Sequence, residues 1–328
     1  MKSYLRYAVA ACVAIALAAV TAKANAADYP SKPLQVLADS AAGSTPDVAL
    51  RFVTEMLTRK WGQQVVVANH PGAGGSVAAG LAARAAPDGY TLYQPVLSTF
   101  VALRKAAPNV PLEVPRDFLP IGFVAENPMF IAVSPKLGIN TLPELIAYAK
   151  AHPGELSYAT TGVGRLTHLT GELLQHEAKI KLLLVPYTGG PAHAISDVGT
   201  QRVSMIIEGY SGIAGAARSG AVKLLAVASS KRLAEFPNLP TVSESIPGFS
   251  ATGWAILVAP LGTPTDIIGK VSKDLYQVTS DPELQKKLAK LGSYARPMTA
   301  KEATEFVHQQ QSTWNPVLAD IVKAQEKK

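Results

Sequence analysis

Short apolar segments that alternate with segments of helical period most limit what this chain can fold into. In the first third they follow one another as strand, helix, strand, helix and strand, over residues 34–38, 46–60, 64–68, 77–85 and 91–96. Within 46–60 the apolar residues recur at the spacing of one helix face. Strands separated by helices predict a parallel sheet with right-handed crossovers.

The same alternation returns in the second half of the chain. Strands are predicted over 156–159, 182–185, 203–207 and 222–228, and helices over 166–176, 191–198 and 211–219. The two halves share an order of elements but little sequence identity. The repeat is therefore one of topology.

Two strand-like segments, 122–133 and 253–259, are placed to carry the chain from the first half to the second and back. Residues 110–119 are proline-rich and predicted to be irregular, and 264–328 are helical in pattern and expected to pack on the first half. The prediction is an α/β protein of two lobes, each a mostly parallel sheet flanked by helices, with a two-strand hinge and a cleft. The expected bounds are 27–130 with 254–328 for lobe 1, and 131–253 for lobe 2.

The first 26 residues have the pattern of a secretory signal peptide. Lys2 and Arg6 precede an uncharged apolar run over 8–20, and Ala24-Asn25-Ala26 provides the small residues that signal peptidase requires. The run is too short for a spanning helix, so we expect export and cleavage after Ala26. A lipoprotein cleavage box ending at Cys12 is the alternative, and it would leave a very short apolar segment before the cut.

Composition argues against binding of nucleic acid. Removal of residues 1–26 takes away Lys2, Arg6 and Lys23 and lowers the formal net charge from +7 to +4. The remaining Lys and Arg residues form no clustered stripe of the kind that nucleic-acid binding needs. Because Cys12 is the only cysteine, the mature chain has no disulfide and no thiolate metal site.

No catalytic set of side chains emerges from the sequence either. His168, Glu172 and His176 would share a helix face, but they lack the His-Glu-x-x-His order of zinc hydrolases. Ser211 lacks the glycine two places on that a nucleophile elbow requires. We therefore expect no enzyme, no bound metal and no cofactor.

The loop over 39–47, between a predicted strand and helix, is the first candidate ligand-binding segment. Thr45 suits the N-cap, Pro46 the first helical position and Asp47 the first turn, so capping alone could explain them. The loop also follows the carboxyl end of a parallel strand, where free N–H groups and the helix dipole favour an anion. Its candidate contacts are Ala42, Gly43, Ser44, Thr45 and Asp47.

The loop over 159–168 is the second candidate and occupies the equivalent place in the second half. Gly162 and Gly164 would let the backbone approach a ligand closely, and Thr160 and Thr161 supply hydroxyls. The candidate contacts here are Thr160, Thr161, Gly162, Gly164, Arg165 and Thr167. Because the two loops occupy equivalent places, together they favour a ligand-binding role more strongly than either loop does alone.

Other candidates lie near the predicted hinge and cleft. Tyr187, Tyr210 and Trp254 are each either core residues, as large aromatics usually are, or ligand contacts. Ser98 and Thr99 follow the strand over 91–96, and Glu208 follows the strand over 203–207. These residues complete the candidate ligand-binding set.

Many ordered segments resemble the substrate-binding proteins of tripartite tricarboxylate transporter systems. They are residues 29–33, 69–75, 86–92, 142–154, 168–172, 185–187, 237–241 and 259–264, with Trp314 near the end. The resemblance implies a type II-like periplasmic binding protein that closes over a small di-, tri- or aromatic carboxylate and needs no cofactor. It also implies integral-membrane permease subunits as partners and a periplasmic location, and we expect a monomer.

Three departures from the family pattern affect the candidate site. Asp39-Ser40 replaces a Pro-aromatic pair, Gly43 stands alone where several glycines are common, and Arg165 replaces a small hydroxylated residue. Arg165 is open to three interpretations: solvated surface, a bidentate grip on the far acid group of a dicarboxylate, or a pair with Asp39 across the closed cleft. A mutant series would separate them.

Two other functions compete with transport. A binding protein that feeds a sensor kinase would use the same closed-lobe surface, and sequence does not separate the two. A periplasmic hydrolase or isomerase is the more distant alternative, because no nucleophile and base are evident.

Overall fold

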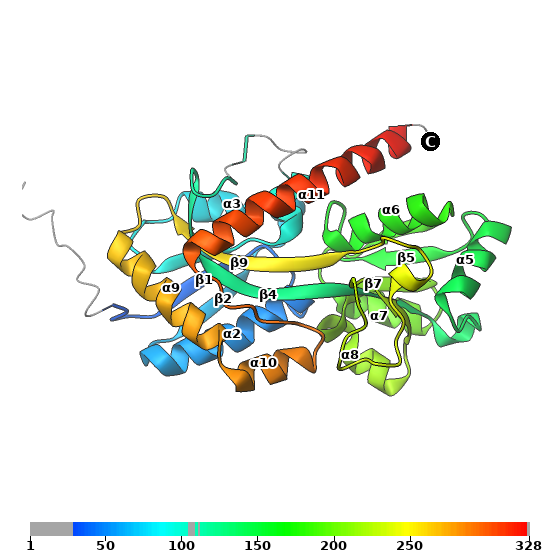
Figure 1. The fold of residues 1–328 in the computed structure, drawn as a ribbon, viewed down its shortest axis with the longest axis horizontal. Helices are drawn as coiled ribbons and strands as arrows, with labels where there is room; N and C mark the ends of the chain where they lie inside the picture. The colour runs from blue at the N-terminus through cyan, green and yellow to red at the C-terminus, as the bar shows by residue number, and fades with distance from the viewer. Residues whose placement is uncertain (1–28, 104–108, 111, 327–328) are drawn as a thin grey trace, which may run out of the picture.

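The computed structural model describes residues 29–103, 109–110 and 112–326, and the predicted signal peptide with its cleavage site lies outside them. The described chain forms two α/β halves that lie next to each other along the longest axis of the molecule (Figure 1). Over these residues, none of the helices combines the length and apolarity needed to cross a bilayer.

The first half follows the predicted order closely. Its elements are β1 (Leu34–Ala38), α2 (Thr45–Trp61), β2 (Val65–Asn69), α3 (Ser76–Ala83) and β3 (Thr91–Gln94). The predicted ends differ from these by at most two residues. β1 pairs in parallel with β2 on one side and with β3 on the other, as strand–helix–strand crossovers require.

The second half repeats this arrangement. After α5 (Leu142–Ala151) it contains β5 (Ser157–Thr160), α6 (Leu166–Ala178), β6 (Leu183–Pro186), α7 (Pro191–Gly199), β7 (Met205–Gly209), α8 (Tyr210–Ser219) and β8 (Lys223–Val227). β5 pairs in parallel with β6 and β7. The strand order β6-β5-β7 therefore matches β2-β1-β3 of the first half.

Two antiparallel strands connect the halves. β4 (Phe118–Val133) runs for 16 residues without a break, and β9 (Thr252–Pro260) lies beside its first part. The last part of β4 pairs with β7 and β8 instead. The predicted crossover segments are thus strands, and β4 begins at Phe118, inside the region expected to be irregular.

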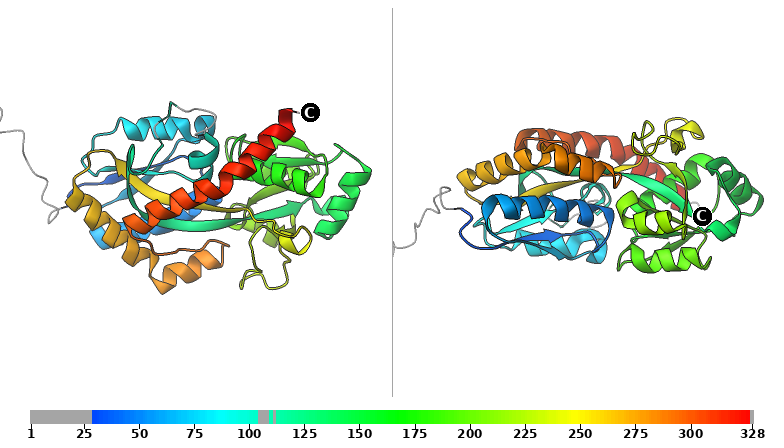
Figure 2. Two further views of the ribbon diagram at one scale, coloured as in Figure 1. Left: turned by 45° about the horizontal axis from the view of Figure 1, so that its top comes forward. Right: turned by 90° about the horizontal axis from the view of Figure 1, so that it is seen from below.

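The C-terminal helices pack on the first half, as predicted, but the last one extends further. α9 (Thr265–Thr279) packs on α2 and β4, and α10 (Pro282–Ala289) on α2 and α9. α11 (Ala300–Glu326) contacts β4 and also α6 of the second half, and its length carries it diagonally across the molecule (Figure 2). α11 therefore packs on the first half, as expected, and in addition reaches the second half.

Gly171 in α6 provides a test of how tightly β5 and α6 pack. A Cβ atom at Gly171 would lie 2.2 Å from the ring of buried Tyr158, whereas one at Gly215 in α8 would meet no atom within 4 Å. Gly171→Ala should therefore lower the free energy of unfolding by about 1–3 kcal/mol. The control Gly215→Ala should raise it by up to about 1 kcal/mol, because alanine favours helix. Urea unfolding measures both, and equal effects would contradict the packing described here.

Candidate functional site

The first candidate loop joins β1 to α2. Its N-cap is Ser44, in extended conformation, and not Thr45, which is already helical. Ser44 Oγ donates to the carbonyl of Ala41 at 2.6 Å. Thr45 Oγ1 instead accepts the backbone N–H of Gly212, in α8 of the second half, at 3.1 Å. The predicted N-cap is therefore wrong by one residue, and the hydroxyl of Thr45 links the two halves.

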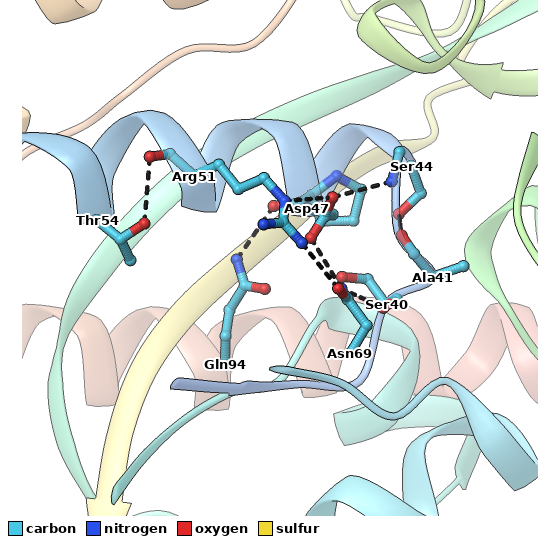
Figure 3. A network of polar contacts seen from close by, with 10 residues as sticks. Ser40, Ala41, Ser44, Asp47, Arg51, Thr54, Asn69 and Gln94 are labelled. Atoms are coloured by element: carbon cyan, nitrogen blue, oxygen red, sulfur yellow. Dashed lines mark hydrogen bonds and ion pairs between the residues drawn. The ribbon is translucent and has the colours of Figure 1, made fainter. Parts of the chain in front are cut away.

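Asp47 holds this loop in shape. Its Oδ2 accepts from the backbone N–H of Gly43 at 2.9 Å and from Arg51 Nε at 3.0 Å, and its Oδ1 accepts from Asn69 Nδ2 at 2.8 Å. The side chains of Asp47, Arg51 and Asn69 converge on one another (Figure 3). Asn69 also donates to the carbonyl of Ser40 at 3.0 Å. Since both oxygens of Asp47 are engaged, its contacts favour the structural interpretation.

The second candidate loop joins β5 to α6. Thr167 Oγ1 accepts from the backbone N–H of Thr161 at 3.0 Å. Gly164 has a φ of 77°, yet a Cβ there would meet no atom within 4 Å. Backbone conformation, and not close approach by a neighbouring protein atom, is what requires glycine at this position.

The contacts of the side chains on α6 do not support a metal site there. His168 Nδ1 accepts from the backbone N–H of Gly164, and Glu172 accepts from Tyr158 and Gln175. Among the residues described, no three His, Cys, Asp or Glu side chains are placed to hold a metal ion.

Arg165 connects the two loops. It is only 8% exposed, so the solvated-surface interpretation is wrong. Its Nη2 donates to the backbone carbonyls of Asp39 and Pro71, the latter at 3.0 Å, and its Nη1 lies 3.5 Å from Asp39 Oδ1. Because Nη2 is engaged in this way, Arg165 cannot offer a ligand its bidentate fork in this arrangement. The pair with Asp39 across the two halves is present.

Asp39 is fully buried among polar partners. Its Oδ2 accepts from Thr99 Oγ1 at 2.5 Å and from Tyr93 Oη at 3.0 Å. Burial raises the pKa of Asp39, and the charge of Arg165 and these hydrogen bonds oppose that rise. The ion pair therefore offsets part of the cost of holding a carboxylate away from water.

A cavity of about 60 Å³ lies between the two loops and the long strands β4 and β9. Seven residues of the predicted set line it: Ser44, Ser98, Thr161, Arg165, Thr167, Glu208 and Trp254. Sequence reasoning missed other lining residues, among them Ser40, Pro71, Leu97, Asn127 and Met129. Ser40 and Pro71 lie in segments that the family resemblance had singled out, whereas Asn127 and Met129 lie inside β4, where no local motif marks them.

The remaining predicted residues lie outside this lining. They are Ala42, Gly43, Thr45, Asp47, Thr99, Thr160, Gly162, Gly164, Tyr187 and Tyr210. Gly162 borders a neighbouring groove of about 360 Å³ that is also lined by residues 72–74. Tyr187 donates to Asp197 Oδ2 at 2.6 Å, and the ring of Tyr210 packs on Phe130 at 5.4 Å between centroids. The partner of Tyr187 lies in the second half, whereas Phe130 lies in β4, at the boundary between the two expected lobes.

Four buried polar atoms of the cavity-lining residues have no hydrogen-bond partner in the described part of the chain. They are Ser40 Oγ, Ser98 Oγ, Arg165 Nη1 and Glu208 Oε2. Buried polar atoms are normally paired, because leaving one unpaired costs about 1–3 kcal/mol. All four belong to residues that line one cavity, which makes this cavity the candidate site for a polar molecule.

Glu208, at the end of β7, is the acidic member of this group and is 2% exposed. Its Oε1 accepts from the backbone N–H of Gly209 at 2.9 Å. Burial raises the pKa of Glu208 to about 7, although the Gly209 N–H and the neighbouring Thr45 oppose the rise. A Cβ at Gly209 would lie 2.4 Å from Thr45 Oγ1, so glycine is needed there for the two halves to meet.

Two α/β lobes joined by antiparallel strands, with a cavity between their strand-to-helix loops, define a periplasmic solute-binding protein. The chain belongs to the tripartite tricarboxylate transporter receptor family, whose model matches residues 49–322. The predicted family and fold class are confirmed. The family consists of periplasmic solute-binding receptors, and the protein is not an enzyme.

Similar proteins cover nearly the whole chain. A UPF0065 protein of Bordetella bronchiseptica is 33% identical over 90% of this chain and 88% of its own length. An R. palustris protein solved with adipate is 26% identical, with a TM-score of 0.85 over 90% of this chain and 98% of that one. MatC of Rhodopseudomonas palustris, solved with bound malate, is 28% identical, with a TM-score of 0.80 over 88% and 99%.

Titration of Glu208 should lower the stability of the protein between pH 5 and pH 8. Its folded pKa of about 7 lies above the ordinary 4.5, so the folded state holds the proton more tightly than the unfolded chain. This stabilisation is fully present below 4.5 and is lost as the pH rises through 7, by about 2–3 kcal/mol. Urea unfolding measures this loss as a fall in unfolding free energy between pH 5 and pH 8. The fall should be about 2–3 kcal/mol smaller for Glu208→Gln than for the wild type. Equal losses in the two proteins would show that Glu208 does not titrate in this way.

The Arg165–Asp39 pair should appear as coupling in a double-mutant cycle. Arg165→Ala leaves a buried carboxylate without its cation and should cost about 3–5 kcal/mol of unfolding free energy. Asp39→Asn in the same background should cost less than it does alone, with a coupling of about 1–3 kcal/mol. The control is Arg202→Ala, which breaks an ion pair with Asp197 that is 73% exposed on the arginine side and should cost at most about 1 kcal/mol. Additive effects of the two buried substitutions would exclude a direct interaction.

Proposed function

We propose that the protein captures a small organic carboxylate in the cavity between its two loops and delivers it to membrane permease subunits. The observation that carries this proposal is the set of buried donor groups in the cavity lining: the unpaired hydroxyls of Ser40 and Ser98, and the guanidinium of Arg165, whose Nη1 lies 3.5 Å from Asp39 Oδ1. A carboxylate is the acceptor that suits two hydroxyls and a guanidinium, because charge-assisted hydrogen bonds are the stronger ones.

Two further features support an anion at this place. The cavity lies at the starts of α2 and α6, and free N–H groups and the helix dipole favour negative charge there. Adipate and malate, the compounds seen with two structural neighbours, are both dicarboxylates. The walls formed by Leu97, Met129 and Trp254 suit the carbon skeleton of such an acid.

Capture by closure of two lobes is part of the proposal. We place the lobe bounds at 27–130 with 254–328 and at 131–253, with β4 and β9 as the hinge. The hydrogen bonds of Thr45 with Gly212 and of Arg165 with Pro71 already join the two halves, so a ligand in the cavity would add to existing contacts between them. Export by a signal peptide cleaved after Ala26 and action as a monomer complete the proposal.

The charge of the acid should dominate affinity. In a thermal-shift screen of carboxylates, an acid present at about 100 times its Kd should stabilise the protein by roughly 2.7 kcal/mol. Its primary amide should bind at least about tenfold more weakly in calorimetry, because one charge-assisted hydrogen bond contributes about 1.5–3 kcal/mol.

A variant ties this result to the cavity. Ser98→Ala removes one donor and should weaken the acid by about 1 kcal/mol, while Arg202→Ala, outside the lining, should leave its affinity unchanged. Equal affinities for the acid and its amide, or no effect of Ser98→Ala, would contradict the proposed mode of binding.

A further inference from the structure

Glu208 differs from the other unpaired groups of the cavity because an ionised carboxylate accepts hydrogen bonds and does not donate them. We infer that the ligand carries, besides its carboxylate, a hydrogen-bond donor, a hydroxyl or ammonium group, that Glu208 Oε2 accepts. Glu208 would then be the residue that determines specificity among acids of one skeleton. This inference rests on the proposed function and narrows its class of substrate.

The side chain of Glu208 is held in place from two directions. Its Oε1 accepts from the N–H of Gly209, and α8 packs on its stem so closely that a Cβ at Gly212 would lie 2.8 Å from Glu208 Cγ. Thr45 of the facing loop touches the next residue, Gly209. A carboxyl group that is fixed in this way and buried cannot turn toward water to satisfy Oε2.

No cation of the described chain pairs with Glu208. Arg165, the one Lys or Arg residue among the described residues that line the cavity, is engaged by Asp39 and by two carbonyls. A buried carboxylate oxygen without a hydrogen bond, as Oε2 is within the described chain, is costly, and a donor on the ligand removes that cost. A deoxy acid leaves Oε2 unpaired, so the site should reject it in the way that sites built to bond a hydroxyl reject analogues without one.

The opposite arrangement, in which a protonated Glu208 donates to a second acid group of the ligand, makes a different prediction. Replacement of Glu208 by Gln separates the two arrangements. With its oxygen on the Gly209 N–H, the Gln amide turns its nitrogen, a donor, toward the cavity. The substitution therefore mimics the protonated acid and opposes a donor on the ligand.

The experiment is calorimetry at pH 8, above the pKa of about 7 of Glu208. The probes are matched sets of acids: succinate, malate and aspartate; glutarate, 2-hydroxyglutarate and glutamate; and propionate, lactate and alanine. In at least one set, the hydroxy or amino acid should bind at least about tenfold more tightly than its deoxy parent. Within that set, tighter binding of the hydroxy acid identifies the donor as a hydroxyl, and tighter binding of the amino acid identifies it as an ammonium group.

Glu208→Gln should reduce this preference to within about twofold or reverse it. The control is Ser134→Ala, which removes a buried, unpaired hydroxyl outside the cavity lining and should keep the preference. Deoxy acids that bind the wild type as tightly, or a preference that survives in Glu208→Gln, would overturn the inference and leave carboxylate capture intact. Failure of every carboxylate in the wider screen to bind would overturn the proposed function itself.

Discussion

The antiparallel pairing of β4 with β9 is the constraint on which the arrangement of the molecule depends. β4 passes from its partner β9 to its partners β7 and β8, with register shifts against β9 and β8, so one strand belongs to both sheets. The parallel strands are arranged in mirrored order, β2-β1-β3 on one side of this pair and β7-β5-β6 on the other. The loops at the carboxyl ends of β1 and β5 are thereby brought together, and the contact between Arg165 and Asp39 shows how closely.

The meeting of these loops places opposite charges away from water. Asp39 and Arg165 depend on each other, because a fully buried acid needs a cation and a buried guanidinium needs acceptors. The carbonyls of Asp39 and Pro71 supply two of those acceptors. As a consequence, both terminal nitrogens of Arg165 face groups of the protein itself, Nη2 the two carbonyls and Nη1 the carboxylate of Asp39, whereas the hydroxyls of Ser40 and Ser98 have no hydrogen-bond partner in the described part of the chain.

The sequence predicts the elements well because hydrophobic period is a local property. The predicted bounds of β1 agree with the structure, and those of α2 and β2 differ by one residue. The N-cap was misplaced because Ser44 and Thr45 are both good caps, and the choice between them is made by Gly212, distant in sequence. Asn127 and Met129 were missed because an apolar strand gives no local sign of which side chains border a cavity. The contact of α11 with α6 likewise depends on how the two halves are oriented relative to each other, and the helical spacing of apolar residues does not encode that orientation.

The distribution of unpaired polar atoms bears on what the cavity is for. Eight buried side-chain N and O atoms lack a hydrogen-bond partner in the described part of the chain. Four of them belong to residues that line the cavity, and one of these four, Arg165 Nη1, forms an ion pair at 3.5 Å with a fifth, Asp39 Oδ1. At about 1–3 kcal/mol each, such groups are a large fraction of the roughly 5–15 kcal/mol by which proteins are stable. Random packing defects would be scattered, whereas these are gathered where two lobes meet. A ligand that pairs them returns that free energy on binding, so occupancy of the cavity and the fit of the two lobes stabilise each other.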